Sequence, residues 1–211
     1  MLQAPNLAKL RWLRHGFGLR NSQYPPGITT VRQIHSAQVV DAAGRSGDRI
    51  EDGDALISHT AGLAVGVRTA DCVPILIADA KLRAIAAIHA GWRGTAGRIV
   101  AETLLHMNET FGSRPEDLVA AVGPCIGACC YEVGPDVARQ FAAWCPELEQ
   151  VSSKVRLDLA AMNATELRRR GVIDVWLAGE CTFCYPDRYF SFRREKEAAG
   201  RMLSFGGIEP A

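Results

Sequence analysis

The stretch that decides the fold is residues 63–90, LAVGVRTADCVPILIADAKLRAIAAIHA. It contains three short apolar runs, at 63–67, 73–78 and 84–89, separated by glycine, aspartate or lysine. Apolar runs of this length with such boundaries favour strands over a helix. The sequence therefore predicts three consecutive strands.

A helix is predicted to follow at about residues 96–108, with Thr95 as its N-cap. Its buried face would consist of four side chains at helical spacing, Ile99, Thr103, Leu104 and Met107.

Further elements are predicted downstream. They are a strand at 118–122, a helix opened by Gly134-Pro135 and carrying Val137, Phe141 and Trp144, a helix capped by Asp158 and closed by Gly171, and a final strand at 172–178. Clusters of strands mixed with separate helices favour a single α+β domain, residues 1–211, over a regular alternating parallel fold.

The composition is that of an ordinary globular protein, 48% hydrophobic and 22% charged, which is enough for a sizeable core. A net charge of +1 gives no reason to expect nucleic acid or an anionic membrane as a partner, and no obligate protein partner is indicated. No apolar run has the length of a signal peptide or a membrane span. The seven cysteines are an odd number, so we expect reduced thiols in a cytoplasmic protein.

Three residues stand out as candidate metal ligands: His35 in VRQIHSAQVV, Cys72 in RTADCVPIL and His89 in AAIHAGW. Each lies at the edge of an apolar segment. Two imidazoles and one thiolate make a suitable zinc set that leaves a fourth position for water or substrate. Their spacing does not bring them together, and single buried histidines and cysteines are common in cores, so both interpretations stay open.

The turn after His89, Gly91-Trp92-Arg93-Gly94, is a candidate anion site. If a helix begins there, its free N–H groups and the forked guanidinium of Arg93 suit phosphate or carboxylate. The alternative is that the glycines serve only the turn and Trp92 only the core.

Other patterns are weaker. Asp71 and Asp54 either orient metal ligands through hydrogen bonds or end strands as turn acids. Cys181 and Cys184 form a lone C-x-x-C, and a structural zinc would need a second pair, for which Cys129-Cys130 lack the usual spacing. We expect unconnected thiols, with a redox dithiol as the alternative. His59 and His106 are assigned no role.

Several motifs resemble, in order and through nearly the whole chain, those of the peptidoglycan editing factor family: QIHSAQVV, DALIS, TADCVPIL, IHAGWRGT, GPCIG with YEVG, and CT with FSFRR. Members of that family have been labelled polyphenol oxidase or laccase-like and are described as purine nucleoside phosphorylases. The resemblance implies β-sheets flanked by helices and a zinc held by His35, Cys72 and His89.

The resemblance also implies an activity. It would be phosphorolysis of adenosine, inosine, guanosine and methylthioadenosine, with adenosine deamination in addition, so the partners would be a nucleoside and phosphate. Bacterial members are linked to removal of wrongly incorporated L-serine from cell-wall precursors. Two features depart from the family: a short segment before His35, which puts part of the pocket wall in doubt, and Cys125 in place of the more usual serine.

Alternative functions remain to be weighed. A multicopper oxidase needs a histidine-rich cluster for dioxygen, which five histidines cannot supply beside the first site. A hydrolase that edits peptidoglycan precursors would use zinc, or Cys72 as a nucleophile with His89 or His35 as base. A structural-zinc interaction module would need a fourth protein ligand, for example Cys125.

Overall fold

The three apolar runs form three strands, as predicted. In this computed structural model, which describes residues 1–210, they are β5 (Ala64–Thr69), β6 (Val73–Asp79) and β7 (Ala84–Ala90). β6 and β7 pair as an antiparallel hairpin, whereas β5 lies in a different sheet.

The hairpin is the centre of a six-stranded sheet with the order β11-β8-β6-β7-β4-β3. The other strands are β3 (Val39–Asp41), β4 (Ala55–Ser58), β8 (Leu118–Val122) and β11 (Asp174–Leu177). Its two outer pairs, β11–β8 and β4–β3, are parallel, and its three inner pairs are antiparallel. The sheet is therefore mixed.

A second sheet has the order β1-β12-β5-β2, with β1 (Leu13–Gly16), β2 (Ile28–Thr29) and β12 (Met202–Ile208). β12 was missed because adjacent glycines in MLSFGGI weaken the strand pattern, so β11 is not the final strand as predicted. A small ribbon pairs β9 (Glu132–Val133) with β10 (Val155–Arg156).

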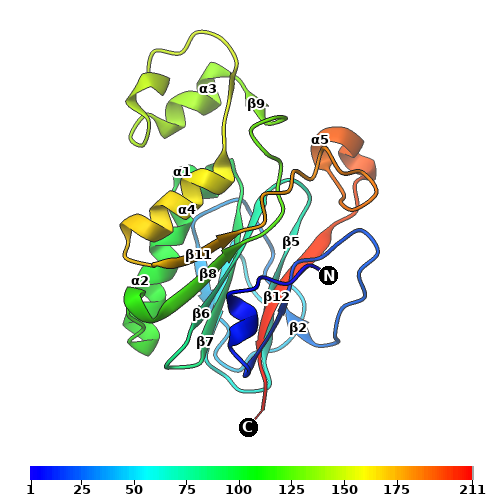
Figure 1. Cartoon of the computed structure of the whole chain (residues 1–211), viewed down its shortest axis with the longest axis vertical. Helices are drawn as coiled ribbons and strands as arrows, with labels where there is room; N and C mark the ends of the chain where they lie inside the picture. The colour runs from blue at the N-terminus through cyan, green and yellow to red at the C-terminus, as the bar shows by residue number, and fades with distance from the viewer. Residues whose placement is uncertain (211) are drawn as a thin grey trace.

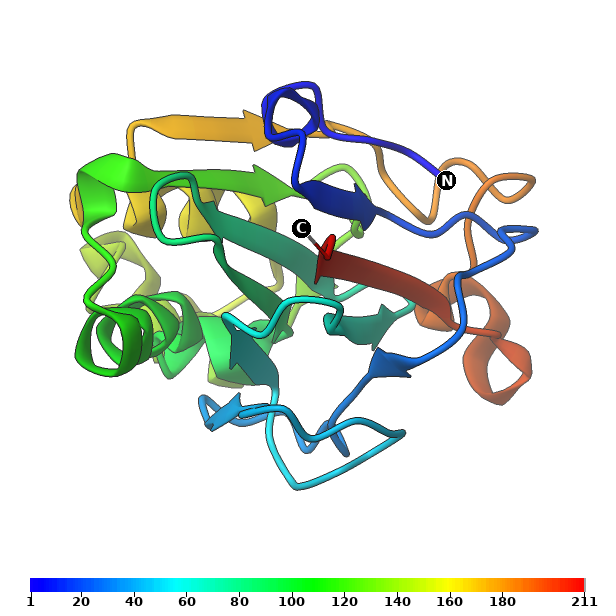
Figure 2. The same cartoon turned by 90° about the horizontal axis from the view of Figure 1, so that it is seen from below.

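The helices cover one face of the six-stranded sheet. Figure 1 shows α1 (Trp92–Ala96), α2 (Ile99–Phe111) and α4 (Leu159–Arg169) on one side and β5 and β12 on the other. Figure 2 shows the same layers from below, with α2 in green and β12 in dark red on opposite sides of the sheet. α3 (Pro135–Ala138) and α5 (Phe192–Glu195) lie at one end of the molecule, and short 3-10 turns occupy Leu7–Lys9, Pro115–Asp117, Arg139–Phe141, Pro146–Leu148 and Lys196–Ala198.

Two hydrophobic cores follow from these layers. Along β6, Ile75 and Ile77 face the core beneath the helices, and Leu76 and Ala78 face the core between the sheets. A strand buried on both faces reads as a continuous apolar run, which explains the pattern of residues 73–78. The α+β class, with mixed sheets flanked by helices, is confirmed.

The helix predicted at 96–108 is interrupted. Arg98, with φ +62°, separates α1 from α2, so α2 begins at Ile99 and its four-residue apolar face is buried as predicted. The Thr95 N-cap is wrong: Thr95 is buried in α1, where its Oγ1 accepts a hydrogen bond from Asn163 Nδ2 at 2.9 Å.

The predicted ends of α4 are confirmed. The Asp158 carboxylate accepts the Ala161 N–H at 2.9 Å, and Gly171 has φ +95° just beyond the last turn. By contrast, the helix opened by Gly134-Pro135 is only one turn of α-helix followed by a 3-10 turn. Within residues 1–210, none of the helices is both long and apolar enough to cross a membrane.

Candidate metal and substrate site

Strand register brings Cys72 and His89 together. Cys72 immediately precedes β6, and His89 is the next-to-last residue of β7. The antiparallel register places Val73 opposite Ala90 and Pro74 opposite His89. The start of one strand therefore lies beside the end of the other, which makes neighbours of residues that are distant in sequence.

His35 joins them from the loop between β2 and β3. The possible ligand atoms of His35, Cys72 and His89 all lie within 4.8 Å of one another, and the two imidazole centroids are 4.9 Å apart. His89 is buried, whereas His35 is exposed, so the group opens to solvent on one side. His35 has φ +59°, a left-handed conformation that is uncommon for residues other than glycine, and the Asp54 carboxylate holds this backbone through the His35 N–H.

Asp54 connects both histidines. It is fully buried, directly before β4, and its Oδ1 accepts hydrogen bonds from His89 Nδ1 at 2.8 Å and from the His35 N–H at 3.0 Å. Its Oδ2 accepts the Ser36 N–H at 2.6 Å. Because a carboxylate accepts the Nδ1 proton, Nε2 is the nitrogen of His89 that can bind a metal once it has lost its own proton. These contacts support the orienting role expected of Asp54.

Asp71 has a different position. Its carboxylate accepts hydrogen bonds from Thr182 Oγ1 at 2.6 Å, Ser191 Oγ at 3.0 Å and the Arg193 N–H at 2.6 Å. It therefore ties two distant loops to the turn that carries Cys72 and does not hydrogen-bond a candidate ligand. Its φ of +92° is strained for a non-glycine residue, as is common at functional sites.

The electrostatics favour a thiolate. Burial raises the pKa of Cys72, but hydrogen bonds and charges from His35 and His89 outweigh burial and lower it to about 6. Burial lowers the pKa of His89, and hydrogen bonds from Asp54 and Cys72 raise it to about 9. With this pKa His89 carries a proton on Nε2 near neutral pH when no metal is bound, and zinc binding would displace that proton. A thiolate and two imidazoles are then a donor set that suits zinc, so these residues fit a zinc ion.

Gly91 leaves space for such an ion. A Cβ at this position would lie 3.1 Å from Cys72 Sγ and 3.3 Å from His35 Cδ2. The backbone at Gly91, with φ −73° and ψ 178°, would accept any residue. A Cβ at Gly94 would lie 3.0 Å from the Ser36 carbonyl oxygen. The two glycines thus allow the turn to pack closely against the loop that carries His35.

The candidate ligands line a cavity of about 950 Å³, within the size range of small-molecule sites. Two classes of side chain are prominent in the rest of the wall. The cations are Arg32, Arg49, Arg68, Arg193, Lys196 and Arg201, and the aromatic residues are Trp92, Tyr131 and Phe192. Most of them were missed as site residues because they come from separate loops. Four lie in motifs of the family resemblance: Trp92 in IHAGWRGT, Tyr131 in YEVG, and Phe192 and Arg193 in FSFRR.

Arg93 lies near this cavity but is not part of its wall. It is exposed and stacks on Trp92, with its guanidinium carbon 4.4 Å from the ring centroid. Burial and the charge of Cys72 raise the pKa of Tyr131 to about 12, while Arg193 and Arg93 oppose this rise. Tyr131 therefore lies within the influence of both guanidinium groups and stays protonated near neutral pH.

The remaining cysteines and histidines lie outside this group. Cys125 is buried, burial raises the pKa of its thiol, and it is not a member of the three-residue cluster. Cys181 and Cys184 are free thiols, but both lie beside Cys129 and Cys130, so the sequence spacing did not rule out a four-cysteine group. The other three histidines are elsewhere: His15 accepts the Ala4 N–H at 3.0 Å, His59 packs on Phe111, and His106 contacts the Glu102 carbonyl.

Residues 10–209 match the model of a family described as multi-copper polyphenol oxidoreductase laccase. Among curated proteins, one from Deinococcus radiodurans named purine nucleoside phosphorylase is 41% identical over 84% of this chain and 69% of its own length. One from Bacteroides thetaiotaomicron with the same name is 42% identical over 72% of this chain and 59% of its own length. This chain thus spans about six to seven tenths of these two relatives.

A protein of an unknown prokaryote named adenosine deaminase RL5 is 35% identical, over 86% of this chain and 74% of its own length. Among solved structures, a Neisseria meningitidis protein aligns with a TM-score of 0.75 and 37% identity, covering 87% of this chain and 76% of that one.

Proposed function

Because the chain belongs to the family described as multi-copper polyphenol oxidoreductase laccase, and its relatives carry the name purine nucleoside phosphorylase, we propose that it cleaves purine nucleosides with phosphate in a metal-dependent reaction. Its substrates would be adenosine, inosine, guanosine and methylthioadenosine. The observation that carries the proposal is the open group of His35, Cys72 and His89 on the wall of a cavity rich in cations and aromatic rings. The catalytic domain would comprise residues 1–211.

Zinc is the proposed ion, held by His35, Cys72 and His89, and it would supply Lewis-acid stabilisation of charge that develops on the substrate. Asp54 fixes the orientation of His89 and the backbone of His35, so the donors are preorganised. A thiol ligand must remain reduced, which supports the cytoplasm as the proposed location.

The cavity wall suits both substrates. Six cations and three acids, Asp71, Glu132 and Asp136, line it, and the Asp71 carboxylate already accepts three hydrogen bonds. Arg32 pairs with Asp52, and Arg49 and Arg68 pair with Asp48, so the excess positive charge comes mainly from Arg193, Lys196 and Arg201. The resulting positive potential favours phosphate. Phe192 is 41% exposed and lines the cavity, so its ring offers a face on which a purine can stack.

In phosphorolysis, a phosphate oxygen bonds to C1′ of the ribose while the bond between C1′ and the purine nitrogen breaks. The purine leaves with the electron pair and takes up a proton. We assign Arg193, whose guanidinium carbon lies 5.5 Å from the Tyr131 ring centroid on the cavity wall, to hold phosphate beside Tyr131. Arg93, which stacks on the wall residue Trp92, would reach the phosphate from behind that ring. The protonated hydroxyl of Tyr131 can donate a hydrogen bond. Holding the reactants in one orientation is the main contribution expected of these side chains.

Product analysis tests the reaction. Zinc-loaded protein is incubated with inosine or adenosine, with and without phosphate, and the products are separated by chromatography. Free base and ribose 1-phosphate, formed only when phosphate is present, are expected. Free ribose would indicate a hydrolase, and ammonia from adenosine would indicate the deaminase named among the relatives. Absence of ribose 1-phosphate under every condition would overturn the proposal.

Removal of a guanidinium should weaken phosphate binding. We expect Arg93→Ala and Arg193→Ala each to raise KM for phosphate about 10-fold or more, equal to a charged hydrogen bond of about 1.5 kcal/mol. Arg93→Lys keeps the charge but loses the forked pair of N–H donors, so its KM for phosphate should lie between those of wild type and Arg93→Ala. Steady-state kinetics with varied phosphate measure this, and Arg114→Ala on the exposed surface is the control. An unchanged KM in both Arg93 variants would make Arg93 merely structural.

One geometric observation favours a second candidate function, a cysteine hydrolase for peptidoglycan precursors. Asp54, His89 and Cys72 stand in the order carboxylate, imidazole, thiol, the arrangement that activates a nucleophile. Metal content decides between the two, since a coordinated thiolate is a poor free nucleophile. Metal-free protein that hydrolyses cell-wall fragments and is inactivated by alkylation of Cys72 would favour the hydrolase.

A further inference from the structure

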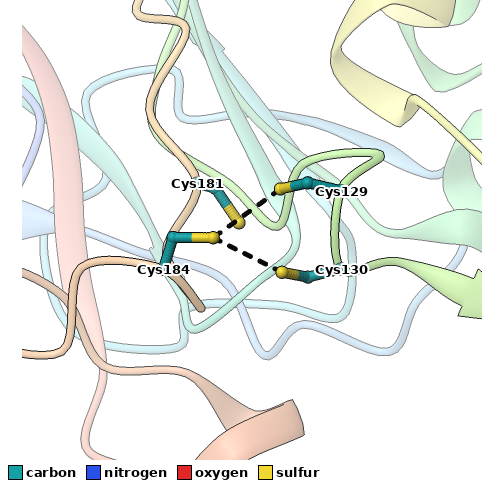
Figure 3. Close-up of side chains that lie close together, drawn as sticks. All are labelled: Cys129, Cys130, Cys181 and Cys184. Carbon is teal, nitrogen blue, oxygen red and sulfur yellow. Dashed lines mark hydrogen bonds between the residues drawn. The ribbon is translucent and has the colours of Figure 1, made fainter.

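Four cysteines gather at a second place in the molecule. The sulfurs of Cys129, Cys130, Cys181 and Cys184 all lie within 4.8 Å of one another. Figure 3 shows the four side chains, from two separate loops, pointing toward a common centre. Neither the three-residue site nor the proposed reaction uses any of them.

The fold brings the two loops together. One follows β8 and the other follows β11, and these strands are parallel neighbours, with Val122 opposite Leu177. Parallel strands end at the same edge of a sheet, so the loops leave side by side. The pairing continues beyond the strands as an isolated parallel bridge between Cys125 and Cys181.

Each loop then turns so that two sulfurs face inward. The Cys130 and Tyr131 N–H groups both donate to the Gly127 carbonyl at 2.9 Å, which closes a tight turn and lets the adjacent Cys129 and Cys130 face one point. The Cys184 N–H donates to the Cys181 carbonyl at 3.2 Å. The spacing of the cysteines in the sequence does not predict this arrangement, because the sulfurs of adjacent cysteines can face one point only when the backbone turns in this way.

The distances match a single tetrahedral ion. With bonds of about 2.3 Å, the sulfurs of a zinc tetrathiolate stand about 3.8 Å apart. Cys184 Sγ lies 3.7 Å from Cys129 Sγ and 3.4 Å from Cys130 Sγ. A disulfide needs about 2.05 Å, and an iron–sulfur cluster, with several atoms between its cysteines, would hold the sulfurs farther apart.

We propose that Cys129, Cys130, Cys181 and Cys184 bind one zinc ion in a closed, structural site. Four thiolates favour zinc over hard cations such as magnesium, and four protein ligands leave no open position for substrate. Binding converts four thiols to thiolates and releases up to four protons. The Gly127 N–H donates to Cys181 Sγ at 3.2 Å, a contact that stabilises a metal-bound thiolate.

The zinc would hold a wall of the cavity. Thr182 lies inside the Cys181–Cys184 loop and donates to Asp71, while Arg194 donates to the carbonyls of Thr182 at 2.9 Å and Phe183 at 2.7 Å. The other loop leads directly into Tyr131, which lines the cavity. A crosslink between the loops therefore fixes the segment that carries Tyr131 against the turn of Cys72.

Zinc per chain tests the proposal. Protein is produced under reducing conditions with zinc, dialysed against metal-free buffer and measured by mass spectrometry of the metal. We expect two zinc ions in wild type, one in Cys72→Ala, one in Cys184→Ser and none in the double variant. Cys145→Ser, outside both clusters, is the matched control and should keep two.

The outcomes separate the two sites. A single zinc in wild type that Cys72→Ala removes would overturn the four-cysteine site and leave the proposed function intact. One zinc in wild type that Cys72→Ala keeps and Cys184→Ser removes would count against the first site and support the second. Unchanged zinc in Cys184→Ser would overturn the four-cysteine site. Iron with inorganic sulfide would overturn the zinc assignment.

A second measurement does not depend on folding of variants. Wild-type protein is treated with iodoacetamide before and after addition of a chelator, and alkylated cysteines are identified by peptide mass spectrometry. We expect Cys129, Cys130, Cys181 and Cys184 all to resist alkylation before the chelator is added and all to be alkylated after it. Alkylation of Cys129 and Cys184, the two exposed members, at full rate before chelation would overturn the proposal.

Discussion

Cys72→Ala is expected to remove one zinc ion per chain and to lower kcat/KM for inosine phosphorolysis at least about 100-fold. Loss of a partner outside the coordination shell commonly costs 10–100-fold, and Cys72 is itself a proposed ligand. The thiolate is also the only anionic ligand of the three, so its loss leaves two imidazoles to hold the cation. Metal analysis and steady-state kinetics on the same samples measure both effects.

Two comparisons make this result specific. Cys145→Ser should retain both zinc and activity, because Cys145 belongs to neither cysteine cluster. Circular dichroism should show that Cys72→Ala keeps its fold. If Cys72→Ala keeps wild-type zinc content and wild-type kinetics, the assignment of Cys72 as a metal ligand is wrong.

Gly123→Ala is expected to destabilise the fold by about 3 kcal/mol or more, equivalent to about 6–12 °C in Tm for a chain of this size. Gly123 follows β8, and a Cβ there would overlap the ring of Phe17, which is fully buried. The ring also packs near Trp176, with centroids 6.2 Å apart, so it has little freedom to move away. Urea unfolding measures the change.

Gly206→Ala is the matched control. Gly206 is also a buried glycine, in β12, but an added Cβ would lie 3.8 Å from Leu13 Cδ1, an ordinary contact. We expect a change within about 1 kcal/mol, because no atom must shift. Equal destabilisation by the two substitutions would show that the overlap with Phe17 is not the cause.

Local sequence signals predicted the elements with strong patterns. The apolar runs at residues 63–90 became β5, β6 and β7, and the Asp158 and Gly171 signals marked the ends of α4. β12 was missed because its glycines lack the side chains on which strand patterns depend. The helix interruption at Arg98 was missed although a local signal precedes it: Gly97 is the C-cap of α1.

The candidate site was only partly visible in sequence. Their positions at the edges of apolar segments identified His35, Cys72 and His89 as candidates. Their proximity depends on the β6–β7 register and on a loop held by Asp54. The cavity cations come from loops whose courses depend on long-range contacts, such as those of Asp71. The four-cysteine cluster could not be predicted either, because it also depends on the courses of two loops that are distant in sequence.

Anomalous diffraction at the zinc edge, on crystals of zinc-loaded and then dialysed wild-type protein, tests the central claim most directly. The account predicts a zinc peak bound by His35 and His89 at about 2.0–2.1 Å and by Cys72 at about 2.3 Å. The fourth position should hold water or another non-protein ligand on the side of the cavity. Absence of a peak among these three residues, or a fourth protein ligand that closes the site, would contradict it.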